Sequence, residues 1–82
     1  MSDAPIVTPA LIADLELLAR FNPRNIGEGL KIHHDADAAV RDAAQRLYDK
    51  RLITQADGGF LTDAGIEALQ HLQVLFSVLA AD

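Results

Sequence analysis

The chain has 82 residues, with seven basic and twelve acidic side chains and a formal net charge of −5 at pH 7. It contains no cysteine, which excludes disulfides, thiolate metal sites and cysteine catalysis. The length predicts a single domain over residues 1–82, with residues 1–7 as a loose leader, and half of the residues are hydrophobic. We expect a cytoplasmic protein, because residues 1–10 lack a signal-peptide pattern and no apolar run reaches the ~18 residues of a membrane span.

The charges are distributed unevenly along the chain. All seven basic residues lie between positions 20 and 51, together with five acidic residues, so this segment carries +2 while both flanking segments are acidic. A nucleic-acid-binding domain is usually basic overall. Any affinity for DNA must therefore come from the middle segment, against an unfavourable background field.

A first helix is predicted over residues 9–21. Thr8 can cap its free amides, and Pro9 suits the first helical position because its missing N–H would have no partner there. Apolar residues recur every three or four positions up to Phe21, which indicates a buried stripe. The helix should end before Asn22-Pro23, since a residue that precedes proline is disfavoured in helical conformation.

A short strand and a second helix follow. Residues 22–29 are rich in turn-forming residues, whereas residues 30–33 alternate apolar and polar in the manner of a strand. Residues 22–34 are too few to hold this strand and also the first helix of a helix-turn-helix. Asp35 is the expected N-cap of a helix over residues 36–50, in which small alanines form a narrow buried face.

The next segment predicts a β-hairpin and a third helix. Residues 52–55 and 59–61 flank Asp57-Gly58-Gly59, a tripeptide that can adopt the positive φ angles of a tight turn. Thr62 then caps a strongly apolar helix, in which Gly65 indicates close packing against a neighbouring element. The predicted fold class is α+β and winged-helix-like, with three main helices, a β-hairpin wing and a short third strand.

The second helix and its surroundings contain the candidate DNA-binding residues. In a winged helix, the helix before the hairpin enters the major groove and the wing contacts the backbone or minor groove. The outward polar residues here, with the nearby cations, are Lys31, Arg41, Gln45, Arg46, Lys50 and Arg51. The competing interpretation is a solvated helix face, because Asp42 and Asp49 lie on the same face and repel phosphate.

The third helix is a candidate dimer interface, because its apolar arc is wide for so small a domain. The residues that define the arc are Leu69, Leu72, Phe76 and Leu79. Burial under the first two helices is the alternative, and a symmetric homodimer is the expected assembly if the arc stays exposed. A protein-interaction module without DNA affinity is therefore the second functional hypothesis.

Other chemistry finds little support in the sequence. His33, His34, Asp35 and Asp37 could ligate a metal, but adjacent histidines on an extended strand point to opposite faces, so we predict no metal site. His71 stands alone on the third helix. We predict no enzyme activity and no cofactor, because no nucleophile–base spacing, phosphate-binding glycine loop or carboxylate pair is present.

Three runs also carry a family resemblance: Gly29-x-Lys31-Ile32-His33, then residues 43–55, then Asp57-Gly58-Gly59-Phe60-Leu61-Thr62-x-x-Gly65. On these runs the chain resembles a small family of bacterial proteins of about this length that are often labelled DNA-binding. The stretch from residue 52 to residue 65 is also similar to the end of many winged-helix regulators. The resemblance implies a small protein that binds DNA and regulates transcription.

Overall fold

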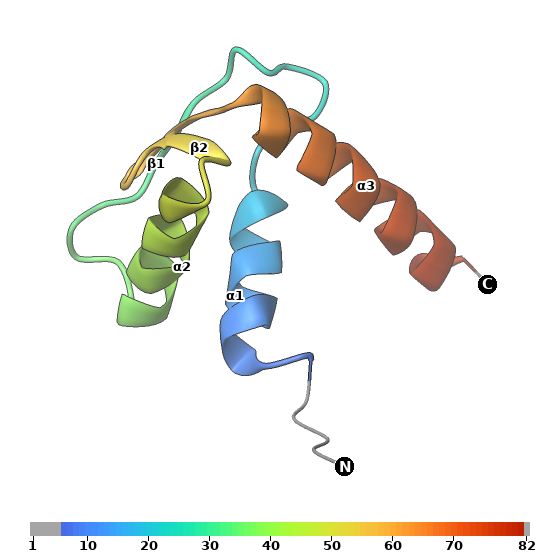
Figure 1. The fold of residues 1–82 in the computed structure, drawn as a ribbon, viewed down its shortest axis with the longest axis horizontal. Coiled ribbons are helices and arrows are strands. Elements are labelled where there is room, and N and C mark those ends of the chain that lie inside the picture. The colour runs from blue at the N-terminus through green and yellow to red at the C-terminus, as the bar shows by residue number, and fades with distance from the viewer. Residues whose placement is uncertain (1–5, 82) are drawn as a thin grey trace.

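The computed structural model describes residues 6–81 and consists of three helices and a small sheet (Figure 1). The elements in chain order are α1 (Pro9–Leu18), β1 (Leu30–Lys31), α2 (Ala38–Asp49), β2 (Ile53–Gln55), β3 (Gly58–Leu61) and α3 (Asp63–Ala80). This confirms the α+β class and the winged-helix-like order, including the third strand. Most of the predicted leader, residues 1–5, lies outside the described residues.

The start of α1 is as predicted, but its end is not. The Thr8 hydroxyl accepts a hydrogen bond from the Leu11 amide at 3.1 Å, and Pro9 occupies the first helical position. The helix ends at Leu18 rather than at Phe21, because the chain tightens into three-residue turns, in which the Phe21 amide donates to the Leu18 carbonyl. Phe21 nevertheless stays in the core, with 4% of its surface exposed.

The chain between α1 and α2 contains turns and one short strand. β1 covers only Leu30–Lys31 of the predicted four residues. A single turn, closed by the Ala36 amide on the His33 carbonyl at 3.0 Å, occupies the place where a helix-turn-helix protein has its first helix. Residues 22–37 contain no helix in the described structure, so a separate first helix is absent there.

Both ends of α2 differ from the prediction by one or two residues. The N-cap is Asp37 rather than Asp35, and its side chain makes no capping hydrogen bond among the described residues. At the other end, the Arg51 and Leu52 amides donate to the Tyr48 and Leu47 carbonyls, each at 2.9 Å. This pair of bonds is a Schellman motif, in which Arg51 takes the left-handed position with φ 60°.

The sheet has the antiparallel order β1-β3-β2. The hairpin turn lies at Ala56 and Asp57, one residue earlier than predicted, and the two glycines belong to β3. Gly58 pairs with Lys31, at φ 119°, and a Cβ there would collide with the Leu30 carbonyl group. The glycines therefore allow β1 to approach β3, in addition to shaping the hairpin.

The start of α3 agrees with the sequence. The Thr62 hydroxyl accepts from the Gly65 amide at 3.1 Å, and Asp63 lies in the first turn, where the helix dipole favours a carboxylate. A Cβ on Gly65 would collide with the Leu52 carbonyl, which confirms the close packing predicted at this glycine.

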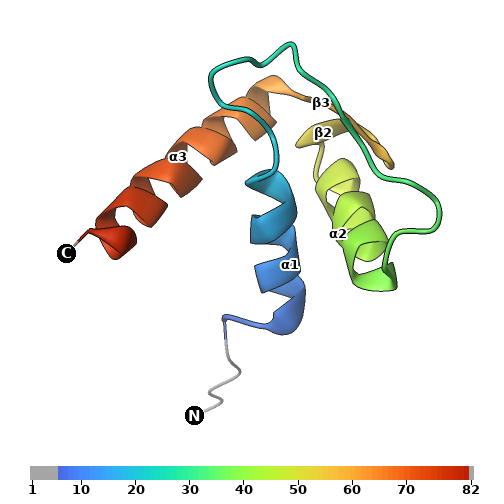
Figure 2. The ribbon, with the colours of Figure 1, turned by 180° about the vertical axis from the view of Figure 1, so that it is seen from behind.

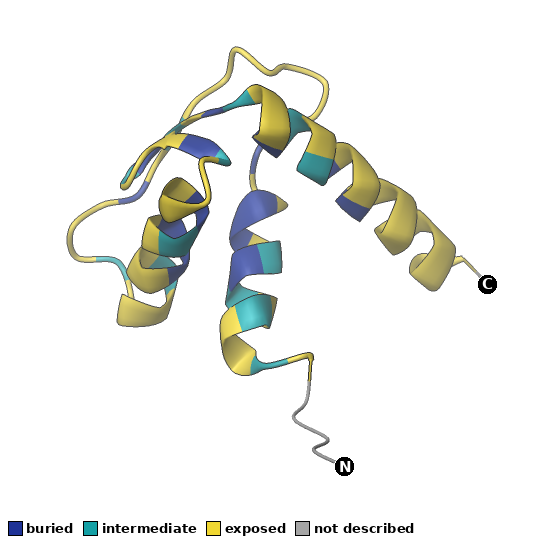
Figure 3. Ribbon diagram, viewed as in Figure 1, coloured by how far each residue is buried: buried dark blue, intermediate teal, exposed yellow. Residues whose placement is uncertain are grey.

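The core lies where α1, α2, the sheet and the first half of α3 meet (Figure 3). Its members are all apolar: Leu17, Leu18, Phe21, Ile32, Ala43, Ala44, Leu47, Ile53, Leu61, Leu69 and Leu72. Seen from behind, α3 diverges from α1 along its length, so only its beginning joins this core (Figure 2). Within residues 6–81, none of the helices is both long and apolar enough to cross a membrane.

Candidate nucleic-acid interface

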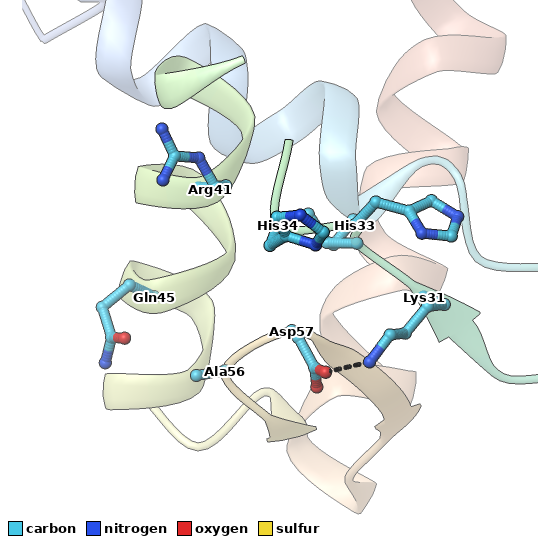
Figure 4. A pocket seen from close by; sticks show the side chains of 8 residues that line it. Lys31, His33, His34, Arg41, Gln45, Ala56 and Asp57 are labelled. Atoms are coloured by element: carbon cyan, nitrogen blue, oxygen red, sulfur yellow. Dashed lines mark hydrogen bonds and ion pairs between the residues drawn. The ribbon is translucent and has the colours of Figure 1, made fainter. Parts of the chain in front are cut away.

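A cleft of about 410 Å³ opens between α2, the segment after β1 and the hairpin turn (Figure 4). Its lining is formed by Lys31, Ile32, His33, His34, Arg41, Gln45, Ala56 and Asp57. Three of the predicted DNA-binding residues therefore line one concave surface: Lys31 comes from β1, and Arg41 and Gln45 come from α2.

β1 places Lys31 on the wing side of the cleft. Lys31 stands opposite Gly58 in the sheet, and the next amide, that of Ile32, donates to the Asp57 carbonyl at 2.7 Å. The Lys31 ammonium pairs with the Asp57 carboxylate across the rim (Figure 4). The hydrogen bond from Lys31 lowers the pKa of the Asp57 carboxyl, so this acid is charged at neutral pH and partly neutralises the lysine.

α2 supplies the opposite wall. Arg41 and Gln45 are four residues apart and thus share one helix face, and both are exposed. The Arg41 Nε donates to the Ala36 carbonyl at 3.0 Å, while the Gln45 Nε2 donates to the Asp49 Oδ1 at 2.9 Å. These bonds hold the side chains along the helix surface and leave the remaining guanidinium donors of Arg41 for another partner.

His33 and His34 link the two walls of the cleft. Both are exposed, and their rings extend in different directions (Figure 4). Within the described part of the chain, no three His, Cys, Asp or Glu side chains are grouped so that they could hold a metal ion. Both histidines are among the residues that line the cleft.

The prediction that Arg46 faces outward to bind DNA is wrong. Its side chain turns toward α1, where Nε and Nη2 contact the Asp14 Oδ1 at 2.9 and 2.8 Å and Nη2 reaches the Ala10 carbonyl at 3.3 Å. The hydrogen bond to Asp14 raises the pKa of the Arg46 guanidinium above its already high value. Arg46 therefore fastens α2 to α1 rather than facing outward.

The other candidates are divided between surface and core. Lys50 and Arg51 are exposed at the C-terminal end of α2, outside the residues that line the cleft. Leu69 and Leu72 are only 2% and 5% exposed and belong to the chain's own core, which corrects their assignment to an exposed dimer face. Phe76 and Leu79 are exposed, as a docking face requires.

The sequence analysis missed three parts of this arrangement. His33 and His34 were considered only as metal ligands, and Asp57 only as a turn residue. The pair between Asp14 and Arg46 joins positions 32 apart, so no local pattern indicates it. The one available signal was Asp14 itself, an acid within an apolar helical stripe, since a buried carboxylate needs a partner.

The fold and the cleft together define a winged-helix-like α+β domain with a polar surface on the helix that precedes the hairpin. The chain belongs to a family of unknown function (DUF5669), whose profile matches residues 6–80. No curated protein and no solved structure matches the chain.

Proposed function

We propose that this protein is a small DNA-binding regulator that contacts DNA through the cleft between α2 and the wing. The observation that carries the proposal is that Lys31, Arg41 and Gln45 line the same concave surface. In winged-helix proteins the corresponding helix enters the major groove. With its side chains an α-helix is about 10–12 Å in diameter, so α2, which is about 18 Å long, can lie in a major groove about 12 Å wide.

Each side chain of the cleft has a contact suited to its chemistry. The fork of Arg41 can bind a phosphate or the O6 and N7 atoms of guanine, and the amide of Gln45 can pair with N6 and N7 of adenine. Lys31 acts as a point charge for a phosphate on the wing side. The arrangement thus offers both positioning contacts and base contacts.

The surrounding carboxylates predict weak and salt-sensitive binding. Asp57 already pairs with Lys31, Asp49 accepts from Gln45, and the chain as a whole carries −5. With two or three phosphates neutralised, log K should fall with log salt with a slope of roughly −2 to −3.

The test is fluorescence anisotropy with labelled mixed genomic fragments at low salt. We expect Arg41→Glu to lower the affinity by at least about tenfold, because it replaces a favourable charge with a repulsive one. The matched control is Arg24→Glu, the same charge reversal at an exposed position in the loop after α1. Absence of binding at low salt, or equal losses in both variants, would overturn the proposal.

A second candidate function is a protein-interaction module that has the winged-helix shape but no DNA affinity. The exposed apolar side chains of α3 favour it, because they suit a protein partner better than a nucleic acid. The two functions are separated by the anisotropy measurement, since the module self-associates or binds protein but leaves the labelled DNA free.

A further inference from the structure

The C-terminal half of α3 extends beyond the core. All residues from 73 to 81 are exposed, and this part of the helix is uncovered on every side (Figure 3). Five large apolar side chains lie on it: Val74, Leu75, Phe76, Val78 and Leu79, with exposures of 64%, 49%, 43%, 66% and 72%. Leu69 and Leu72, which directly precede this segment, are the last residues of α3 in the core.

Such a helix end is unfavourable in water. Short helices are marginal without tertiary packing, and most helical stability in proteins comes from a buried apolar face. Contiguous apolar patches of more than a few hundred Å² are rare on monomers and mark interaction sites. The two last turns of α3 therefore need a covering partner in order to persist as helix.

The charge pattern selects a second copy of the chain as this partner. No residue from Leu72 to Ala81 is charged, so two copies that each carry −5 can approach here without like charges facing one another. Acidic residues stand on both sides of this segment in the sequence: Asp82 follows it directly, and Glu67, whose carboxylate lies 3.8 Å from the His71 imidazole, precedes it by about one turn. A partner selected by charge would find no complementary group, whereas an identical apolar helix end matches under two-fold symmetry.

The available area suits a small dimer interface. The five side chains expose roughly 500 Å² per copy, taking on the order of 170 Å² for a fully exposed side chain of this size. Pairing two copies would thus bury up to roughly 1,000 Å² of apolar side chain in total, which is at the lower end of specific interfaces.

We infer that this protein is a homodimer in which the C-terminal halves of two α3 helices pair antiparallel across a two-fold axis. None of the interface residues lines the cleft between α2 and the wing, so both clefts of the dimer stay accessible. The inference does not depend on DNA binding, and its test contains no DNA.

The first test is the mass in solution by size exclusion with light scattering, at about 100 µM, a hundredfold above a micromolar dissociation constant. The wild type should have twice the 8.8 kDa mass of one chain, and Leu79→Glu should have 8.8 kDa. Leu79 is 72% exposed, so this substitution leaves the core intact. The matched control, Ile26→Glu in the loop after α1, replaces another exposed apolar residue, 54% exposed, and should stay dimeric.

The second test locates the two-fold axis. The chain has no cysteine, so Ser77→Cys introduces a single thiol on the exposed half of α3. Mild oxidation should link two copies through this thiol, whereas Ala56→Cys on the wing should stay unlinked at the same concentration. A monomeric wild type, a Leu79→Glu variant that remains dimeric, or equal cross-linking of the two thiols would each overturn the inference.

Discussion

Replacing Arg51 with glycine tests the cost of placing a residue with a side chain in a backbone conformation that favours glycine. Arg51 follows the C-cap residue Lys50 and adopts φ 60°, a conformation that favours glycine. Its amide and that of Leu52 close the end of α2 through backbone bonds, which do not depend on the side chain. Glycine should therefore keep both bonds and relieve the strain.

The expected gain can be worked out from two opposing terms. The left-handed conformation costs an L-residue about 1–2 kcal/mol, whereas glycine loses about 0.5–1 kcal/mol more backbone entropy on folding. Arg51→Gly should thus stabilise the protein by about 0.5–1 kcal/mol. For a domain of this length, that gain corresponds to roughly 3–6 °C in the melting temperature.

The assay is urea denaturation of the wild type, Arg51→Gly and the control Lys50→Gly. Lys50 has φ −85°, so glycine there should only lose stability, by about 0.5–1 kcal/mol. The reasoning is refuted if Arg51→Gly is destabilised as much as Lys50→Gly.

Two further predictions concern the packing of α3 and the rim of the cleft. Gly65→Ala should lower the free energy of unfolding, measured in urea, by about 1–2 kcal/mol. The new Cβ would collide with the Leu52 carbonyl, and the cost of this overpacking exceeds the ~1 kcal/mol gain in helix propensity. A stabilised variant would contradict this reasoning. The pKa of Asp57 is lowered from its ordinary value of 3.8 by the hydrogen bond from Lys31, so the charged pair stabilises the fold above that value and is lost as pH falls through the lowered pKa. The melting temperature of the wild type should therefore exceed that of Asp57→Asn at pH 7 and match it well below pH 3.8, and a pH-independent difference would refute the assignment. The same substitution frees Lys31 and should raise DNA affinity severalfold at low salt in the anisotropy assay.

Local chemistry explains why the sequence predicted the helix starts well. Thr8 and Thr62 cap α1 and α3 through their own hydroxyls, over only three residues each. Gly65 was a reliable signal of close packing, because a glycine inside a helix is otherwise unfavourable. Such signals depend on neighbours in sequence and need no knowledge of the tertiary arrangement.

Tertiary contacts explain the predictions that were wrong. The hairpin turn precedes Gly58 because that glycine is needed beside the Leu30 carbonyl group, a contact between strands far apart in sequence. Arg46 looked like an outward cation from its helix position, but the buried Asp14 of α1 binds it. Leu69 and Leu72 were predicted to lie on an exposed apolar arc of α3. They are buried, because α3 diverges from α1 only gradually and leaves the core after Leu72.

The candidate site was predictable in its residue types and not in its shape. The order of a helix, a hairpin and a further helix, together with the helical period of α2, predicted Lys31, Arg41 and Gln45 as DNA-binding residues. The cleft itself depends on the turn after β1, which brings His33 and His34 between the two walls. That turn contains no periodic pattern, so its position could be known only from the fold.

The most direct measurement of the central claim is a titration of isotope-labelled protein with short duplex DNA, followed by amide NMR shifts. The proposed interface predicts that the largest shifts cluster at residues 31–34, 41–45 and 56–57, and that they decline as salt is added. Residues 73–81 should shift little, because the second copy of the chain covers them. No shifts at all, or shifts concentrated on the C-terminal half of α3, would contradict the assignment of the cleft as the DNA-binding surface.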